Sequence, residues 1–227
     1  WESASGAIFY GYIDKEVPEG NLDSSIVYRR DLPIIIGMDF NVDPMCWIMA
    51  QFDQEKKRFN VFDELFVRNT NTVSCLQELY KRYGTHTSGF FFFGDASGRA
   101  RKTSASESDY IQIQQAINEG KFKGCRIKCL TKNPRIANRF ASCNMVFCNA
   151  KGERRAFIHP SVKHLRQDLQ ERQYKEGTNE PDDYGDVGHS SDAFGYPVHI
   201  IFPIAVRLTD KEPAIFASRR VPQLQGF

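Results

Sequence analysis

The sequence predicts an α/β domain built on a mixed sheet of five or more strands, with helices on both faces. Three observations support this class. Two segments, 32–40 and 89–95, are apolar without alternation, as strands buried on both faces are. Segments 45–53 and 58–67 indicate a hairpin whose turn is the charged run DQEKK. Helical patterns then alternate with strand patterns along the rest of the chain.

The first half of the chain supplies most of the strands. Residues 1–33 carry one apolar patch, GAIFYGYI, which indicates a leading strand or a linker. The buried strand 32–40 and the hairpin follow. Apolar residues recur at helical spacing through 73–84, and Gly84 marks the end of that helix. A helix therefore connects the hairpin to the strand at 89–95, and such a crossover places this strand parallel to 32–40.

The second half alternates short strands with helices. Ser106 and Asp109 resemble a capping box for a helix that ends before Gly120. Cys125 and Cys129 share the inner face of the next strand, CRIKCL. The remaining elements are a helix capped by Asn133-Pro134, a short strand at RAFIHP, a helix that starts at Ser161, a polar loop at 174–188 and a last helix opening with HSSDAFGY.

Five side chains are expected at one edge of this sheet. Asp39 and Asp95 each end an apolar strand, and parallel neighbours finish on the same side, where open α/β sheets place their sites. Asp192, near the start of the last helix, can reach the same edge. His189 lies three residues earlier on the same helical face, and Asp43 follows the first strand within local reach.

Converging carboxylates repel one another unless cations lie between them. Hard divalent ions take oxygen ligands, and Mg²⁺ keeps waters that a phosphate can replace. Two such ions about 4 Å apart can activate water and stabilise the leaving oxygen of a phosphodiester. Asp39 would bridge the two ions, and His189 would favour Mn²⁺ in the second position. The pattern predicts a metal-dependent nuclease.

Several of these residues also have plainer explanations. Asp43 precedes a proline and suits a turn as well as a metal site. His189 suits a group that supports a ligand as well as a ligand itself. Ser190 is predicted to cap the helix, and Asp63 and Glu64 are predicted to be solvated or paired carboxylates at an edge of the sheet.

Composition limits the partners and the compartment. The net charge is only +2, yet 99–166 holds fifteen Lys or Arg against four acids, an excess of +11, which favours a polyanion such as nucleic acid. The acidic stretch 176–192 has six acids and no Lys or Arg. The six cysteines lack zinc spacing and predict buried reduced thiols. Neither a signal peptide nor a membrane-spanning apolar run is present, so no membrane partner is expected.

A series of short motifs carries a family resemblance. In chain order they are SASGAIFYGY, IIIGMDFNVDP, FDELFVRNTNT, FFFFGDASG, KNPRIANR, IHPSVKHLRQDL, YKEGT and HSSDAFGY. Together they resemble the nuclease domain of the terminase large subunit of tailed bacteriophages, a DNA-packaging motor, which has a ribonuclease H-like (RuvC-like) fold.

The resemblance implies an endonuclease that cuts concatemeric viral double-stranded DNA during genome packaging, with two divalent metal ions, Mg²⁺ or Mn²⁺, and little sequence specificity. Asp39, Asp95 and Asp192 match the family's catalytic, metal-binding aspartates, while Asp43 and His189 match accessory metal-site positions. The implied partners are duplex DNA and, in the full-length protein, an ATPase domain, the portal protein and the small terminase subunit. The implied location is the cytoplasm of the infected or lysogenic bacterial host.

The resemblance also divides the chain into three parts. Residues 1–30 would be a leading strand or linker from an absent upstream ATPase domain, 31–205 the nuclease domain and 206–227 a C-terminal tail. No G-x-x-x-x-G-K-[ST] motif occurs, so this fragment is not expected to hydrolyse ATP. Pro197 departs from the family pattern and should kink or shorten the last helix.

Basic residues are expected to grip the DNA backbone without reading bases. One group lies in the loop GRARKTSAS after Asp95, and two pairs are predicted on the outer faces of the following helices. The predicted contacts are Arg99, Arg101, Lys102, Arg135, Arg139, Lys163 and Arg166. The loop 174–188 suits either a flap over the DNA or a solvated connection.

Two other functions remain open from the sequence. A junction resolvase or a transposase-like nuclease would share the fold, although no element for dimerisation or DNA-structure selection is evident. A DNA-binding or portal-binding module without catalysis would keep the carboxylates only as a structural remnant.

Overall fold

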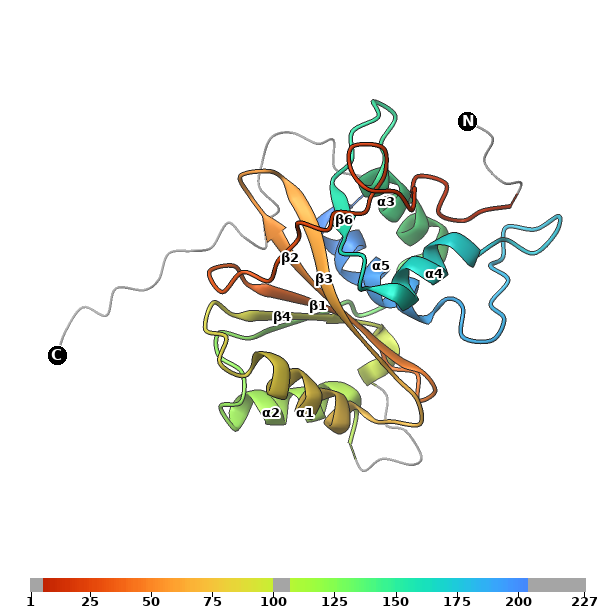
Figure 1. The fold of residues 1–227 in the computed structure, drawn as a ribbon. Coiled ribbons are helices and arrows are strands. Elements are labelled where there is room, and N and C mark those ends of the chain that lie inside the picture. The colour runs from red at the N-terminus through yellow and green to blue at the C-terminus, as the bar shows by residue number, and fades with distance from the viewer. Residues whose placement is uncertain (1–5, 100–106, 204–227) are drawn as a thin grey trace.

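The computed structural model describes residues 6–99 and 107–203. Within them, six strands form one mixed sheet in the order β5-β4-β1-β2-β3-β6 (Figure 1), which confirms the predicted α/β class. The strands are β1 (Ile34–Asp39), β2 (Met45–Asp53), β3 (Arg58–Val67), β4 (Phe90–Gly94), β5 (Arg126–Cys129) and β6 (Ala156–Ile158). The helices are α1 (Thr72–Tyr83), α2 (Asp109–Asn118), α3 (Ile136–Phe147), α4 (Lys163–Glu171) and α5 (His189–Ile201), with a 3₁₀ turn at Ala96–Arg99.

Helices cover both faces of the sheet, as predicted. The pair α1 and α2 packs on one face, and α3, α4 and α5 pack on the other (Figure 1). The central strand β1 sends alternate side chains to the two layers: Ile35 enters the α3–α5 side, and Ile34 and Ile36 enter the α1–α2 side. Because both faces are covered, β1 is apolar and buried almost to its end.

The register of β1 against β4 fixes what lies at their carboxyl ends. The two strands are parallel, as the helical crossover predicts, and Met38 pairs with Gly94. Asp39 and Asp95 occupy the next positions of the same register. On its other side β1 pairs antiparallel with β2, and β2 pairs antiparallel with β3, so the predicted hairpin is confirmed.

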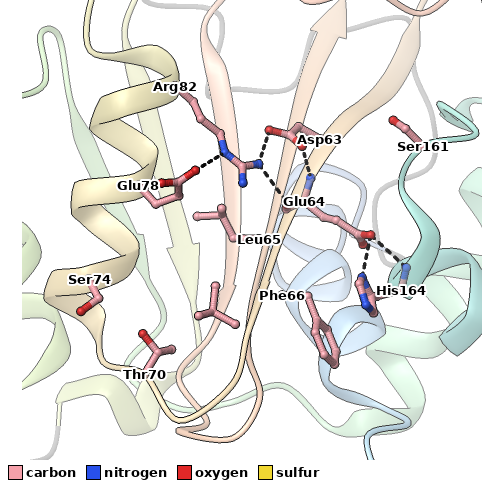
Figure 2. A pocket seen from close by; sticks show the side chains of 11 residues that line it. Asp63, Glu64, Leu65, Phe66, Thr70, Ser74, Glu78, Arg82, Ser161 and His164 are labelled. Atoms are coloured by element: carbon pink, nitrogen blue, oxygen red, sulfur yellow. Dashed lines mark hydrogen bonds and ion pairs between the residues drawn. The ribbon is translucent and has the colours of Figure 1, made fainter.

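A hollow of about 510 Å³ flanks β3 between α1 and α4 (Figure 2). Its polar groups bond to one another. Arg82 donates to Asp63 at 2.8 Å and to Glu78 at 2.9 Å. Glu64 accepts the backbone N–H groups of His164 (2.9 Å) and of the next residue (3.0 Å), and so caps α4. Of the two predicted alternatives, solvated or paired, Asp63 and Glu64 are paired carboxylates. The hollow is a space between β3, α1 and α4 whose polar groups are already bonded to one another.

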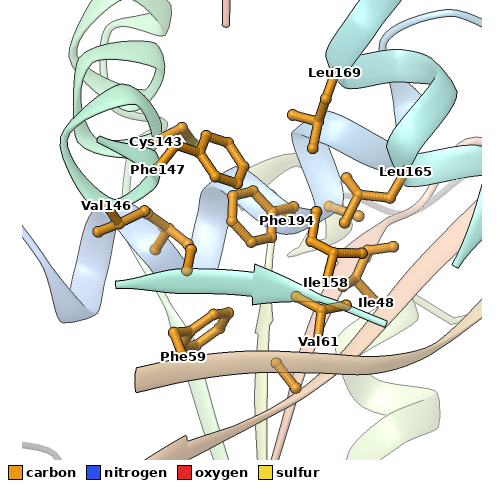
Figure 3. Packing of buried hydrophobic residues seen from close by; sticks show 14 of the residues in the cluster. Ile48, Phe59, Val61, Cys143, Val146, Phe147, Ile158, Leu165, Leu169 and Phe194 are labelled. Carbon is orange, nitrogen blue, oxygen red and sulfur yellow. The ribbon is translucent and has the colours of Figure 1, made fainter. Parts of the chain in front are cut away.

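The larger hydrophobic core lies between the sheet and α3, α4 and α5 (Figure 3). Phe194 of α5 stacks on Phe147 of α3, with ring centroids 5.2 Å apart and planes 12° apart. Leu165 and Leu169 of α4 are buried in the same cluster. This packing seats α5 on the sheet and therefore fixes where the first turn of α5 begins.

Residues 6–27 are built into this core, where they form isolated bridges rather than the leading strand that the sequence allows. The backbone N–H of Ile8 donates to the carbonyl of Arg172 at 3.2 Å. The Ile8 carbonyl accepts from Asn144 Nδ2 of α3 at 2.8 Å. Asn21, fully buried, donates to carbonyls of α3 and of β6. Residues 6–27 therefore connect α3, β6 and the residue that directly follows α4.

Four helix starts differ from the predicted ones. Ser190, predicted to cap the last helix, lies inside α5, whose N-cap position is Gly188. Ser106 lies outside the described residues, and the N-cap of α2 is Ser108, whose side chain accepts the N–H of Ile111. Asn133 does not cap α3, which begins after Arg135 without a side-chain cap. Nor does Ser161 cap α4. Its hydroxyl bonds to a neighbouring histidine instead, because Glu64 has taken the capping role from a distance.

The last helix lies so close to β1 that one position admits no side chain. A Cβ atom on Gly37 would lie 2.0 Å from the carbonyl oxygen of Ala193 and 3.0 Å from Cδ of Pro197. In a regular helix the Ala193 carbonyl would accept from the N–H of residue 197, which a proline lacks. The helix nevertheless continues through Pro197 to Ile201, so the expected shortening does not occur.

The cysteines match only part of the expectation that they are buried reduced thiols. All six are free, and Cys46, Cys75 and Cys143 are buried, whereas Cys125, Cys129 and Cys148 are half-buried. None of the described helices combines the length and the apolar character that crossing a bilayer requires.

Candidate active site at the carboxyl edge of the sheet

The structure brings the three predicted aspartates to one end of the sheet. Asp39 ends β1, Asp95 directly follows β4, and Asp192 lies in the first turn of α5, which packs on β1. Burial, together with the charges of Asp192 and Asp95, raises the pKa of Asp39, against the lowering effect of His189. Asp39 therefore lies within electrostatic reach of both other aspartates.

Asp39 and Asp95 are each held through one carboxylate oxygen. Asp39 Oδ2 lies 2.7 Å from Nδ1 of His189. Asp95 Oδ1 accepts two hydrogen bonds of 2.6 Å, from the backbone N–H of Ser97 and from Nδ2 of Asn133. Asn133, predicted to cap a helix, thus orients a carboxylate of the site instead, and its Oδ1 accepts the N–H of Ala96.

Asp192 is held in the same manner by two arginines. Its Oδ1 accepts from Nη2 of Arg139 and from Nη1 of Arg172, each at 2.6 Å. Arg139 comes from α3, and Arg172 directly follows α4. The DNA-binding role predicted for Arg139 is wrong, because its side chain is only 5% exposed and turns inward to Asp192.

The donor chemistry of this edge suits divalent cations. Among the described residues, no hydrogen bond engages the second carboxylate oxygen of Asp39, Asp95 or Asp192. No group of three His, Cys, Asp or Glu side chains within 6–99 and 107–203 is arranged as a ready-made metal site. Carboxylate oxygens are nevertheless the donor type that Mg²⁺ or Mn²⁺ takes, and one oxygen on each of the three aspartates is left without a hydrogen bond among the described residues.

The two accessory positions differ from the central three. Asp43 is 43% exposed on its side chain and lies 3.5 Å from Arg68, which also pairs with Asp186. His189 has both ring nitrogens engaged, Nδ1 by Asp39 and Nε2 by Nδ2 of Asn41 at 3.2 Å. The bond to Asp39 is the main cause of the raised pKa of His189. This geometry favours His189 as a residue that orients Asp39 rather than as a free ligand.

The predicted DNA-binding cations have different surroundings. Arg99, Arg135 and Lys163 are exposed. Arg101 and Lys102 lie outside the described residues. Arg166 is not on an open surface, since its guanidinium forms two 2.9 Å bonds to the carboxylate of Asp14 and its side chain is 24% exposed. Its predicted role is therefore corrected to a structural ion pair.

Asp168 positions the start of α5 and has no signal in the sequence. Its Oδ2 accepts the backbone N–H groups of Gly188 at 3.0 Å and Ser191 at 2.8 Å, so it caps α5 from α4. Burial raises the pKa of Asp168 to about 6, although both backbone donors and Arg172 lower it. Because this bond fixes the backbone of Ser191, it also fixes the position of Asp192, the next residue of α5.

An Asp168→Asn substitution should change the pH dependence of stability. A raised folded-state pKa stabilises the fold below the unfolded carboxyl pKa, and this contribution is lost as pH rises through about 6. The free energy of unfolding of D168N relative to the wild type should therefore increase by about 2–3 kcal/mol from pH 4 to pH 7. Urea titrations at several pH values measure it.

Asp14→Asn supplies a control of opposite sign. Arg166 lowers the pKa of Asp14, so this carboxylate stabilises the fold above its unfolded pKa and loses that contribution as pH falls. A D168N difference that does not vary with pH would contradict the raised pKa of Asp168.

Known structures share this fold. No protein-family model and no curated protein matches the chain. The large terminase of a thermophilic bacteriophage superposes with a TM-score of 0.61 at 12% identity over 86% of this chain, which spans only 44% of that one. The P22 large terminase nuclease domain gives 0.60 at 11% identity over 87% of this chain and 92% of that chain. The large terminase nuclease of thermophilic phage G20c with bound magnesium gives 0.52 at 14%, over 86% and 96%. The chain therefore has the ribonuclease H-like α/β fold of phage large-terminase nuclease domains.

Proposed function

We propose that this chain is the nuclease part of a phage large terminase, a divalent-metal-dependent endonuclease that cuts concatemeric viral double-stranded DNA during genome packaging. The observation that supports it best is the carboxyl edge of the sheet. There Asp39, Asp95 and Asp192 are each anchored through one oxygen and keep the other available. The fold likeness supports the same assignment, since the similar G20c nuclease was solved with bound magnesium.

In this proposal Asp39, Asp95 and Asp192 would hold the two divalent ions. When bound, the ions supply Lewis-acid activation of the attacking water and charge stabilisation of the leaving oxygen. The chain's own residues supply the orientation. His189 fixes one oxygen of Asp39, and Asn133 fixes one oxygen of Asp95. These bonds hold the Asp39 and Asp95 carboxylates in one orientation, so neither side chain would have to change its rotamer to bind an ion.

Basic side chains next to Asp95 would position the DNA backbone. Arg99 lies four residues after Asp95 and donates to the carbonyl of Cys129 in β5 at 3.0 Å. Lys132 and Arg135 flank Asn133 and are exposed. Cations in this arrangement contact phosphates, which position a duplex without reading its sequence. Cutting with little sequence specificity follows.

Metal-dependent nicking of supercoiled plasmid tests the proposal. We expect the chain to convert plasmid to open-circular and linear forms with Mn²⁺ or Mg²⁺, and to leave it intact with chelator. Asp95→Ala should abolish cutting, while Asp31→Asn, a carboxylate that pairs with Arg29 before β1, should cut like the wild type. Cutting that persists in chelator or in D95A would rule out this site as the catalytic one.

The ion pairs on Asp192 favour one competing function, a DNA-binding or portal-binding module without catalysis. Two buried arginines already compensate this carboxylate, as they would in a purely structural site. Such a module would bind DNA in gel-shift assays, and its Asp95→Ala variant would bind equally, but neither protein would nick plasmid with any metal.

The remaining partners and the location belong to the proposed full-length protein. We infer that an ATPase domain, the portal protein and the small terminase subunit are partners there, in the cytoplasm of the infected or lysogenic host. This chain spans less than half of the length of the first large terminase that it resembles, which leaves room for such a domain.

A further inference from the structure

Two buried arginines converge on one carboxylate oxygen of Asp192. Arg139 and Arg172, here called the arginine clamp, both donate to Asp192 Oδ1 at 2.6 Å. Their side chains are 5% and 1% exposed, whereas that of Asp192 is 22% exposed. Guanidinium groups are rarely buried to this degree without a specific partner.

Arg139 reaches Asp192 through a notch in α5. A Cβ atom on Gly195 would lie 2.8 Å from Cγ and 2.9 Å from Cδ of Arg139, so only glycine leaves room for its stem. The guanidinium carbon lies 4.6 Å from the ring centroid of Tyr196. Its Nε is buried without a hydrogen-bond partner among the described residues. The contact with Asp192 is thus retained although it leaves one polar atom of Arg139 unsatisfied.

Arg172 connects Asp192 to the backbone at the start of α5. It donates to the carbonyl of Gly188 at 3.2 Å and to the hydroxyl of Ser191 at 2.9 Å. It also donates to Asp183 at 2.9 Å, in the acidic loop before α5. The rigid, planar guanidinium of Arg172 therefore fixes both the start of α5 and the carboxylate of Asp192.

Burying two cations around one carboxylate contributes little net stability to the packing of a helix. Desolvation offsets most of the attraction in buried ion pairs, and apolar side chains of similar size often stabilise equally well. Phe194 and the surrounding core already seat α5 on the sheet. The two bonds also fix the rotation of the Asp192 carboxylate and leave Oδ2 as its free oxygen.

We propose that Arg139 and Arg172 are positioning residues that hold Asp192 in the orientation needed to bind a divalent cation together with Asp39 and Asp95. This role rests on the proposed nuclease function, but it concerns cation binding and can be measured without DNA. Lysine cannot replace either arginine, because a single ammonium cannot reach Asp183, Ser191 and Asp192 at once as Arg172 does, and it lacks the planar group that Arg139 places over Tyr196.

Four substitutions test the clamp in the full chain. Arg139→Lys and Arg172→Lys keep the charge but lose the planar guanidinium, and Gly195→Ala displaces the stem of Arg139 without removing it. Arg29→Gln removes a cation that pairs with Asp31 and Asp53, ahead of β1, and serves as the control. Mn²⁺ affinity is measured by calorimetry, folding by circular dichroism, and kcat and KM by plasmid nicking.

We expect the two lysine variants and G195A to fold, to bind Mn²⁺ about 10–100-fold more weakly and to lose a similar factor in kcat, with KM for DNA unchanged. R29Q should match the wild type in all three. Because G195A keeps both arginines, it tests the clamp even if a lysine variant fails to fold.

The outcomes separate the clamp from the nuclease function. Wild-type Mn²⁺ affinity and kcat in the folded variants would overturn the clamp and leave the nuclease intact. If the wild type binds Mn²⁺ but does not cut, weaker binding in the variants would still support the clamp. A wild type that neither binds Mn²⁺ nor cuts would overturn both.

Discussion

An Asp39→Ala variant is expected to lose DNA cleavage by about a thousandfold or more while unfolding at a higher temperature than the wild type. Cleavage is lost because the proposed nuclease site relies on Asp39, which lies within electrostatic reach of both Asp95 and Asp192. Stability rises because burial and the charges of those two neighbours raise the pKa of Asp39, which means that its ionised form is disfavoured in the fold. His189 loses its partner, but its side chain is 28% exposed, so water can replace that bond.

Removing a repelled, largely buried carboxylate should raise the free energy of unfolding by about 1 kcal/mol, or the melting temperature by roughly 2–4 °C. Mn²⁺ should raise the melting temperature of the wild type and have no effect on D39A. Cleavage that survives Asp39→Ala with its metal dependence intact would refute the assignment of this edge as the active site.

A Gly37→Ala substitution is expected to destabilise the fold by at least about 3 kcal/mol. The new methyl group would lie 2.0 Å from the carbonyl oxygen of Ala193, a backbone atom that cannot rotate away. Relief requires α5 to lift from β1, which would open the core around Phe194 and displace Asp192. Urea unfolding measures the loss, and nicking assays at low temperature should show reduced kcat even where the variant is folded.

A second substitution tests the cause of this clash. Pro197→Ala restores an N–H that can donate to the Ala193 carbonyl as a helical partner and draw it back from β1. The double variant G37A/P197A should therefore be more stable than the sum of the single changes predicts, with a coupling of about 1 kcal/mol. A cost of G37A below about 1 kcal/mol would show that the two elements separate easily.

Sequence patterns predict the position of Asp39 and Asp95 because local rules determine it. Uninterrupted apolar runs identify buried strands, and a helical crossover makes neighbouring strands parallel. The two aspartates therefore finish at the same edge, and the register of Met38 against Gly94 confirms it. The position of Asp192 follows from its place at the start of a helix that packs on the central strand.

The supporting residues are not predictable in this way. Charged residues on helices are usually exposed, so the sequence places Arg139 on an outer face, and nothing in its spacing announces a partner 53 residues away. Asp168 and Glu64 cap helices distant in sequence, whereas capping patterns in a sequence detect only local partners. The motif Asn-Pro predicts a helix cap at Asn133, yet its side chain bonds to Asp95.

The hydrogen bonds of Ile8 connect the two backbone segments that carry the arginine clamp. Its N–H is bonded to the carbonyl of Arg172, and its carbonyl is bonded to Asn144 of α3, the helix that carries Arg139. Residues that precede β1 in the sequence therefore cross-link the two segments from which both arginines reach Asp192. A truncation that removes residues 6–8 would break this cross-link without touching the sheet itself.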